Sequence, residues 1–110
     1  MSTIWPVEQA LADTDHARAI MQRLDGQLRA LGIVAVWLYG SHAKGCAQEN
    51  SDWDLMVEFS GPVLLREVRA FYLELHARFA DYVHMQSAQF CNDAFFVEAI
   101  QDTCILIWES

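Results

Sequence analysis

The chain has 110 residues, of which 54% are hydrophobic and 20% charged, a composition typical of one folded domain and unlike a disordered segment. Seven Lys and Arg against fifteen Asp and Glu give a net charge of -8, and no basic run could follow a nucleic-acid backbone, which argues against direct binding to long DNA or RNA. No apolar run approaches the roughly 18 residues of a membrane span, and no signal-peptide pattern opens the chain, so we expect a cytoplasmic, single-domain protein over residues 1–110.

The cysteines and histidines give no sign of a structural metal site. Cys46, Cys91 and Cys104 are odd in number and far apart, and the four histidines show no zinc-ligand spacing with them. We therefore expect reduced thiols, as in most cytoplasmic proteins.

The first predicted element is an amphipathic helix from Thr14 or Asp15 to Leu31, with Gly32 as its C-terminal cap. Ahead of it, residues 6–11 predict a short helical turn with proline at its first position. The helix is predicted from apolar residues that recur at helical spacing, namely Ala17, Ile20, Met21, Leu24, Leu28 and Leu31.

A buried strand is predicted next, over Ile33–Tyr39, because this apolar, β-branched run lies between two glycines. A Gly-Ser turn ends it, followed by a short helix over residues 41–46 and a polar loop over 47–51. A second strand is then expected over Asp52–Phe59.

The rest of the chain predicts a helix, a strand and a mixed tail. Ser60-Gly61-Pro62 is a helix-start signal, and a long amphipathic helix follows to Phe79. A third strand is expected over about residues 80–85, a helix over about 93–100, and at 104–108 either a fourth strand or a helix extension.

Asp52 and Asp54 form the first candidate site. On a strand, residues i and i+2 share a face, so the two carboxylates point to one side while Trp53 points into the core. Like charges so placed repel each other, and a divalent cation relieves the repulsion. The pair therefore predicts a magnesium site, with a solvated strand edge as the alternative for the pair taken alone.

Gly40 and Ser41 are the second candidate. A residue without a Cβ lets the backbone approach a phosphate, and Ser41 adds a hydroxyl at a helix start with unpaired N–H groups. An ordinary turn would explain this dipeptide alone, but its fixed distance from the acidic pair favours a site for a magnesium-bound nucleoside triphosphate. Lys44 and His42 flank the turn, where each is either a phosphate contact or a surface residue.

Asp81 is the third candidate. At the head of a strand lying beside Asp52–Phe59, it would bring a third carboxylate to the same place. Its role would be that of a metal ligand or of a general base toward an acceptor hydroxyl. The alternative is a strand-end aspartate that faces water.

These residues carry a family resemblance. Gly40-Ser41-x-Ala43-x-Gly45, followed after the fixed spacing by Ser51-Asp52-x-Asp54-Leu55-x-Val57 and later by Asp81, resembles the minimal nucleotidyltransferases of the DNA polymerase β superfamily. The resemblance implies a small α/β domain with a short mixed sheet and helices packed mainly on one side. It covers nearly the whole chain.

The resemblance also implies an activity. Such enzymes transfer a nucleoside monophosphate from a triphosphate to a hydroxyl, and pyrophosphate leaves. Gly40, Ser41 and Lys44 would bind the phosphates, while Asp52, Asp54 and Asp81 would bind Mg²⁺ or activate the acceptor. Stand-alone members are antitoxins of type VII toxin–antitoxin systems that add AMP from ATP to a tyrosine of a HEPN toxin.

One departure from the family keeps two alternatives open. Many relatives have Arg where this chain has His42 and Lys44, and these residues grip phosphate less firmly. An antitoxin that neutralises its partner by binding alone is the first alternative. A small-molecule nucleotidyltransferase or a nucleotide sensor is the second.

Overall fold

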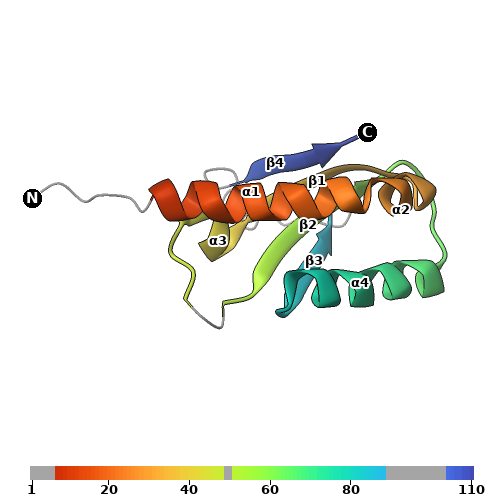
Figure 1. Ribbon diagram of the computed structural model, residues 1–110. Coiled ribbons are helices and arrows are strands. Elements are labelled where there is room, and N and C mark those ends of the chain that lie inside the picture. The colour runs from red at the N-terminus through yellow and green to blue at the C-terminus, as the bar shows by residue number, and fades with distance from the viewer. Residues whose placement is uncertain (1–6, 49–50, 89–103) are drawn as a thin grey trace, which may run out of the picture.

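A computed structural model describes residues 7–48, 51–88 and 104–110 of the chain. Within these residues, none of the helices combines the length and the apolar character needed to cross a membrane. The elements, shown in Figure 1, follow in the order α1 (Val7–Arg23), α2 (Asp25–Ala30), β1 (Ile33–Tyr39), α3 (Gly40–Lys44), β2 (Trp53–Phe59), α4 (Leu65–Phe79), β3 (Val83–Ser87) and β4 (Ile105–Glu109).

The strands form one mixed sheet in the order β3-β2-β1-β4. β1 pairs antiparallel with β2 and β4, whereas β2 and β3 are parallel and are joined through α4. A parallel pair needs such a crossover, because a tight turn cannot bring the chain back to the starting edge. The α/β class and the short mixed sheet are confirmed.

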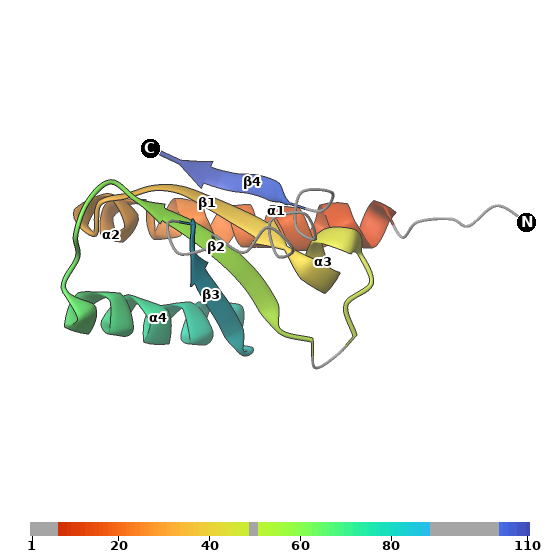
Figure 2. The same cartoon turned by 180° about the vertical axis from the view of Figure 1, so that it is seen from behind.

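The helices α1, α2 and α4 cover one face of the sheet, as Figures 1 and 2 show from opposite sides. The core lies between them and the strands. Trp53, on the helix-covered face of β2, is 5% exposed, which confirms its predicted place in the core. The fully buried side chains include Met21, Leu24, Leu28, Ile33, Val36, Leu38, Leu55, Val57, Leu75 and Val83.

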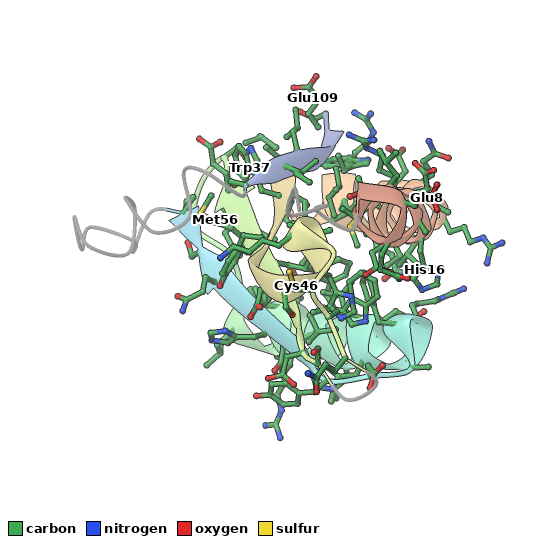
Figure 3. All side chains as sticks on the ribbon, turned by 90° about the vertical axis from the view of Figure 1, so that its left-hand side faces the viewer. Glu8, His16, Trp37, Cys46, Met56 and Glu109 are labelled. Carbon is green, nitrogen blue, oxygen red and sulfur yellow. The ribbon has the colours of Figure 1, made fainter. Side chains whose placement is uncertain are left out.

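The other face of the sheet carries the alternate residues. In Figure 3, Trp37 and Met56 lie on the side of the sheet turned away from α1 and α4. These two residues are Cα partners in the β1–β2 ladder, and Tyr39 and Asp54 are partners two residues further along it. Since side chains alternate along a strand, Asp54 shares the face of Met56. The helices cover one face, and the Asp54 carboxylate belongs to the other.

The first predicted helix differs from the structure at its start and in its middle. α1 begins at Val7, and Leu24 interrupts the run with φ -97° and ψ 9° before α2 resumes. Asp25 then accepts a hydrogen bond from Trp108 Nε1 at 3.0 Å, a contact between residues 83 apart. Apolar spacing continues through the break, so periodicity could not reveal it.

The start of the third strand also differs. α4 ends at Phe79, and Ala80 adopts the left-handed conformation with φ 56° and ψ 27°, so β3 begins only at Val83. The prediction that Asp81 heads this strand is wrong, because Asp81 lies in the bend before it. The alternatives for residues 104–108 are decided in favour of a strand that pairs with β1. The helix predicted near 93–100 falls outside the described residues.

Ala80 predicts a stabilising substitution. A side chain in the left-handed region costs about 1–2 kcal/mol, and glycine avoids that cost at some loss of chain entropy. We expect Ala80→Gly to raise the free energy of unfolding by about 0.5–1 kcal/mol in urea titrations. The matched control Ala70→Gly, at an exposed position inside α4, should lower it by about 1 kcal/mol. Equal losses at both positions would contradict the explanation.

Candidate functional site

The Gly-Ser turn and the acidic pair meet at one end of the sheet. Tyr39, the last residue of β1, is the Cα partner of Asp54 near the start of β2, so Gly40 follows directly beside Asp54. Gly40 has φ +76°, and a Cβ built on it would collide with Oδ2 of the Asp54 carboxylate. Backbone conformation and space therefore both require glycine here.

The two carboxylates have different surroundings. Asp52 is exposed just before β2, whereas the Asp54 side chain is 23% exposed. Burial raises the pKa of Asp54, and the charge of Asp52 adds to this, while the hydrogen bond and positive charge of His84 oppose it. Burial without a full counter-charge leaves the Asp54 carboxylate electrostatically unfavourable, and a cation on it would be stabilising.

Asp52 and Asp54 fit a magnesium ion that arrives with its nucleotide. Mg²⁺ keeps several waters and is usually held by one or two carboxylates together with substrate phosphates. Among the residues that the structure describes, no group of three His, Cys, Asp or Glu side chains forms a cage that could hold a metal by itself. Two carboxylates without a third protein ligand correspond to the number that such a nucleotide-bound magnesium would need from the protein.

Asp81 does not join this group within the described part of the chain. It is exposed in the bend after α4, and Tyr82, the next residue, already pairs with β2 through the Trp53 N–H, at 3.0 Å. The residue level with Asp54 in β3 is His84, whose Nδ1 lies 3.5 Å from Asp54 Oδ1. Sequence reasoning missed His84 because its position depends on where β3 begins.

Ser41 and Lys44 lie on α3, which has only five residues and ends at Gly45 in the left-handed conformation. Ser41, partly buried, follows Gly40 directly, and its carbonyl accepts the Cys46 N–H at 2.9 Å. Lys44 is exposed in the last turn of α3 and is the single lysine of the sequence. The turn thus carries one exposed positive charge, that of Lys44.

The sequence predicted His42 as a phosphate contact or a surface residue, but the structure buries it. Its side chain is buried, with Nδ1 2.9 Å from Asp13 Oδ2 and Nε2 3.3 Å from the Ser51 carbonyl oxygen. The ring stacks on Trp53 with centroids 3.5 Å apart and planes inclined by 7°. Both ring nitrogens therefore lie within hydrogen-bonding distance of oxygen atoms.

The His42 contacts connect α1 to the start of β2. Asp13 lies on α1 and also accepts a hydrogen bond from Gln9 Nε2, at 2.9 Å, while Ser51 directly precedes the acidic pair. The ring therefore bridges a fixed helix and the backbone that positions Asp52. His42, the residue after Gly40-Ser41, thus helps to hold the start of β2 in place from the side of α1.

The close approach at Gly40 predicts that alanine substitutions at Gly40 and at Gly26 have opposite effects on the free energy of unfolding. Gly40→Ala should lower the free energy of unfolding by at least about 1–2 kcal/mol, because alanine is strained at positive φ and its Cβ displaces the Asp54 carboxylate. Gly26→Ala is the control, since a Cβ there meets no atom within 4 Å and the site lies in α2. This control should be stabilised by up to about 1 kcal/mol in the same urea titration. Similar values for both variants would refute the close approach at Gly40.

The Asp13–His42 pair predicts a coupled loss. His42→Ala should cost about 2–4 kcal/mol of unfolding free energy, because it leaves a buried carboxylate and a carbonyl without a donor. The double variant Asp13→Ala/His42→Ala should lose about 1 kcal/mol less than the sum of the single variants. Additive losses would mean that the two side chains do not interact. Lys44→Ala, at an exposed position, serves as the near-neutral control.

Solved structures of similar fold include nucleotidyltransferases and antitoxins. A minimal nucleotidyltransferase structure is 26% identical with a TM-score of 0.68, over 84% of this chain and 93% of that chain. A toxin–antitoxin structure with AMP-PNP is 15% identical, with a TM-score of 0.64 over 81% and 73%. The MNT antitoxin in complex with a tri-AMPylated HEPN toxin of Shewanella oneidensis is 12% identical, with a TM-score of 0.56 over 81% and 69%. The last two likenesses are evidence of fold alone.

The family is shown by the sequence itself. No significant match is found among curated protein sequences. Residues 23–110, however, match the family described as polymerase beta nucleotidyltransferase, a span that contains the Gly-Ser turn and the acidic pair. The chain therefore belongs to the polymerase beta nucleotidyltransferase family.

Proposed function

We propose that this chain is a Mg²⁺-dependent nucleotidyltransferase that transfers AMP from ATP to a tyrosine hydroxyl of a HEPN toxin and thereby acts as its antitoxin. The observation that carries the proposal is the close approach of Gly40 to the Asp54 carboxylate. It brings the Gly-Ser turn directly beside a carboxylate that gains from a bound cation.

Each site residue has a defined part in the proposal. Asp52 and Asp54 hold Mg²⁺, which when bound neutralises charge on the triphosphate and on the leaving pyrophosphate. Gly40 admits the phosphates, Ser41 donates its hydroxyl to them, and Lys44 adds a positive charge from the end of α3. No contact in the described ranges links Asp81 to the pair, so the proposal depends on Asp52 and Asp54.

The reaction balances without any further reagent. The tyrosine oxygen attacks the α-phosphorus of ATP, the bond from that phosphorus to the bridging oxygen breaks, and pyrophosphate leaves. The hydroxyl proton passes to a base or to water. The chain's part is to hold the triphosphate in line with the acceptor, which is the main source of catalysis in such transfers.

A protein acceptor is supported by two solved structures of similar fold, both of toxin–antitoxin pairs. One similar structure is a toxin–antitoxin complex with AMP-PNP, and another holds a tri-AMPylated HEPN toxin with its MNT antitoxin. Those descriptions concern those proteins. We extend them to this chain because its turn and acidic pair lie together at the same end of a similar sheet.

Neutralisation by binding alone is the second candidate, and one observation favours it. His42 is buried against Asp13 and Trp53, so it gives no charge to a phosphate, and the turn depends on Lys44. A weaker hold on the triphosphate would slow transfer without weakening a complex with a partner protein.

Label transfer separates the two candidates. The full chain and the HEPN-domain protein that co-purifies with it are incubated with Mg²⁺ and each α-labelled nucleoside triphosphate in turn. We expect label on the partner with ATP, and a loss of about a hundredfold or more in Asp52→Asn/Asp54→Asn, because metal stabilisation of the developing charge contributes several kcal/mol.

The control is Glu8→Gln/Asp15→Asn, which removes two exposed carboxylates from α1 and should leave the rate unchanged. A stable complex without label from any nucleotide would reject the transferase and support the binding antitoxin. Label that survives in Asp52→Asn/Asp54→Asn would reject the assigned metal ligands.

A further inference from the structure

We propose that the face of α4 turned toward β3 is the docking surface for the HEPN-domain partner, whose apolar side chain enters a cavity there while its acidic residues contact two arginines. The inference deepens the function proposed above and takes the identity of the partner from it. It assigns the binding of the partner to residues outside the Gly-Ser turn and the acidic pair.

An apolar cavity opens between the start of α4 and the ends of β2 and β3. It has a volume of about 630 Å³, and its lining includes Phe59 of β2, Met85 of β3 and Val68 of α4. Binding clefts commonly measure roughly 300–1,000 Å³, and the lining here is mostly apolar. The cavity therefore suits a large apolar side chain better than a charged group.

Apolar side chains at the rim of this cavity face solvent. Leu65, the first residue of α4, lines the cavity and is 83% exposed, and Val63 and Leu64 just before it are 37% and 53% exposed. Single apolar residues are ordinary on a protein surface, but a run of them beside an open apolar cavity is typical of an interaction site. A partner that covers this rim would be bound by the hydrophobic effect.

Two arginines lie beside the apolar rim. Arg66 and Arg69 are both exposed on α4, and Arg69 lies one turn after Leu65 on the same side of the helix. Glu67 points elsewhere, because residues one or two apart on a helix do not face each other. In a chain of net charge -8 this surface is locally basic, so it favours a partner segment that carries acidic residues.

The same side of α4 continues from the cavity to the start of β3. Tyr72 and His76 follow Leu65 at helical spacing, and β3 runs alongside α4 in Figures 1 and 2. The His76 ring lies 4.4 Å from the Tyr72 ring and 5.1 Å from the Tyr82 ring, measured between centroids. Tyr82 is exposed and directly precedes β3, so the aromatic side chains extend this face to the edge of the sheet.

This aromatic end of the face lies near the acidic pair. Burial, the hydrogen bond and charge of Tyr82, and the charge of Asp52 raise the pKa of Tyr72 to about 12. A helix rises about 1.5 Å per residue, so Leu65 and His76 are roughly 16 Å apart along α4. A partner held in the cavity thus extends along α4 toward Asp52, and contacts remote from the reacting atoms then help to orient its tyrosine.

The test measures binding and transfer separately, with the full chain and the HEPN-domain protein that co-purifies with it, each isolated from the other. Titration calorimetry without nucleotide gives the dissociation constant, and label transfer gives kcat and KM for the partner. Leu65→Ser should raise the dissociation constant and KM about tenfold or more, because central apolar contacts dominate such interfaces. At saturating partner, kcat should stay within about twofold, as expected when only binding is lost.

A second variant tests the charge complementarity. Arg69→Glu should slow association about fivefold and reduce the weakening of the complex by salt, because exposed interface charges act mainly on the association rate. The matched controls lie on α1, where Leu11→Ser removes an exposed leucine and Arg23→Glu reverses an exposed charge. Both controls should leave binding and transfer unchanged, and circular dichroism confirms that each variant is folded.

Three outcomes would overturn the assignment. The first is unchanged binding in Leu65→Ser and Arg69→Glu. The second is self-association of the chain alone that Leu65→Ser abolishes, because a second copy would then be the occupant. The third is a marked fall in the melting temperature of free Leu65→Ser, since the chain itself would then cover this side chain.

Failure of the proposed function looks different. Weaker binding in Leu65→Ser and Arg69→Glu, with no label from any nucleotide, rejects the transferase and retains the docking surface. Label transfer with an unchanged KM in both variants does the reverse. The absence of any complex between the two proteins rejects both.

Discussion

The site depends on one close approach between backbone and side chain, that of the Gly40 backbone to the Asp54 carboxylate. The antiparallel ladder sets Tyr39 opposite Asp54, so the turn after β1 must pass directly over that carboxylate. With φ +76° and no room for a Cβ, the position admits glycine alone. The space that a Cβ would take is filled by the Asp54 carboxylate, so this geometry holds the carboxylate against the backbone of the turn.

The buried histidine shows how the chain holds this arrangement in place. His42 stacks on Trp53 and bridges Asp13 of α1 to the Ser51 carbonyl, so the first helix is tied to the backbone just before Asp52. Trp53 carries the connection onward, because it also contacts Phe79 at the end of α4. His42, which the sequence suggested as a phosphate contact, is instead buried and helps to hold the start of β2 in place. Lys44 is then the exposed cationic side chain of the turn.

The acidic start of β2 carries a partly buried charge that a cation would stabilise. Burial raises the pKa of Asp54, and His84 compensates only in part. Functional sites often retain such unfavourable charge, because the ligand that relieves it then binds more tightly. The side chains of Asp54 and His84 stay partly exposed, at 23% and 48%, so the charge remains in contact with solvent.

Local patterns were sufficient for much of this protein. The sequence alone determined the strand Ile33–Tyr39 and the burial of Trp53, because alternation and glycine punctuation are properties of neighbouring residues. Only the tertiary structure decided the break at Leu24, the inward turn of His42 and the placing of His84 beside Asp54. Each depends on a contact between distant segments: Asp25 with Trp108, His42 with Asp13, and β3 with β2. Such contacts leave no periodic signal, because their free energy arises only when the chain has folded.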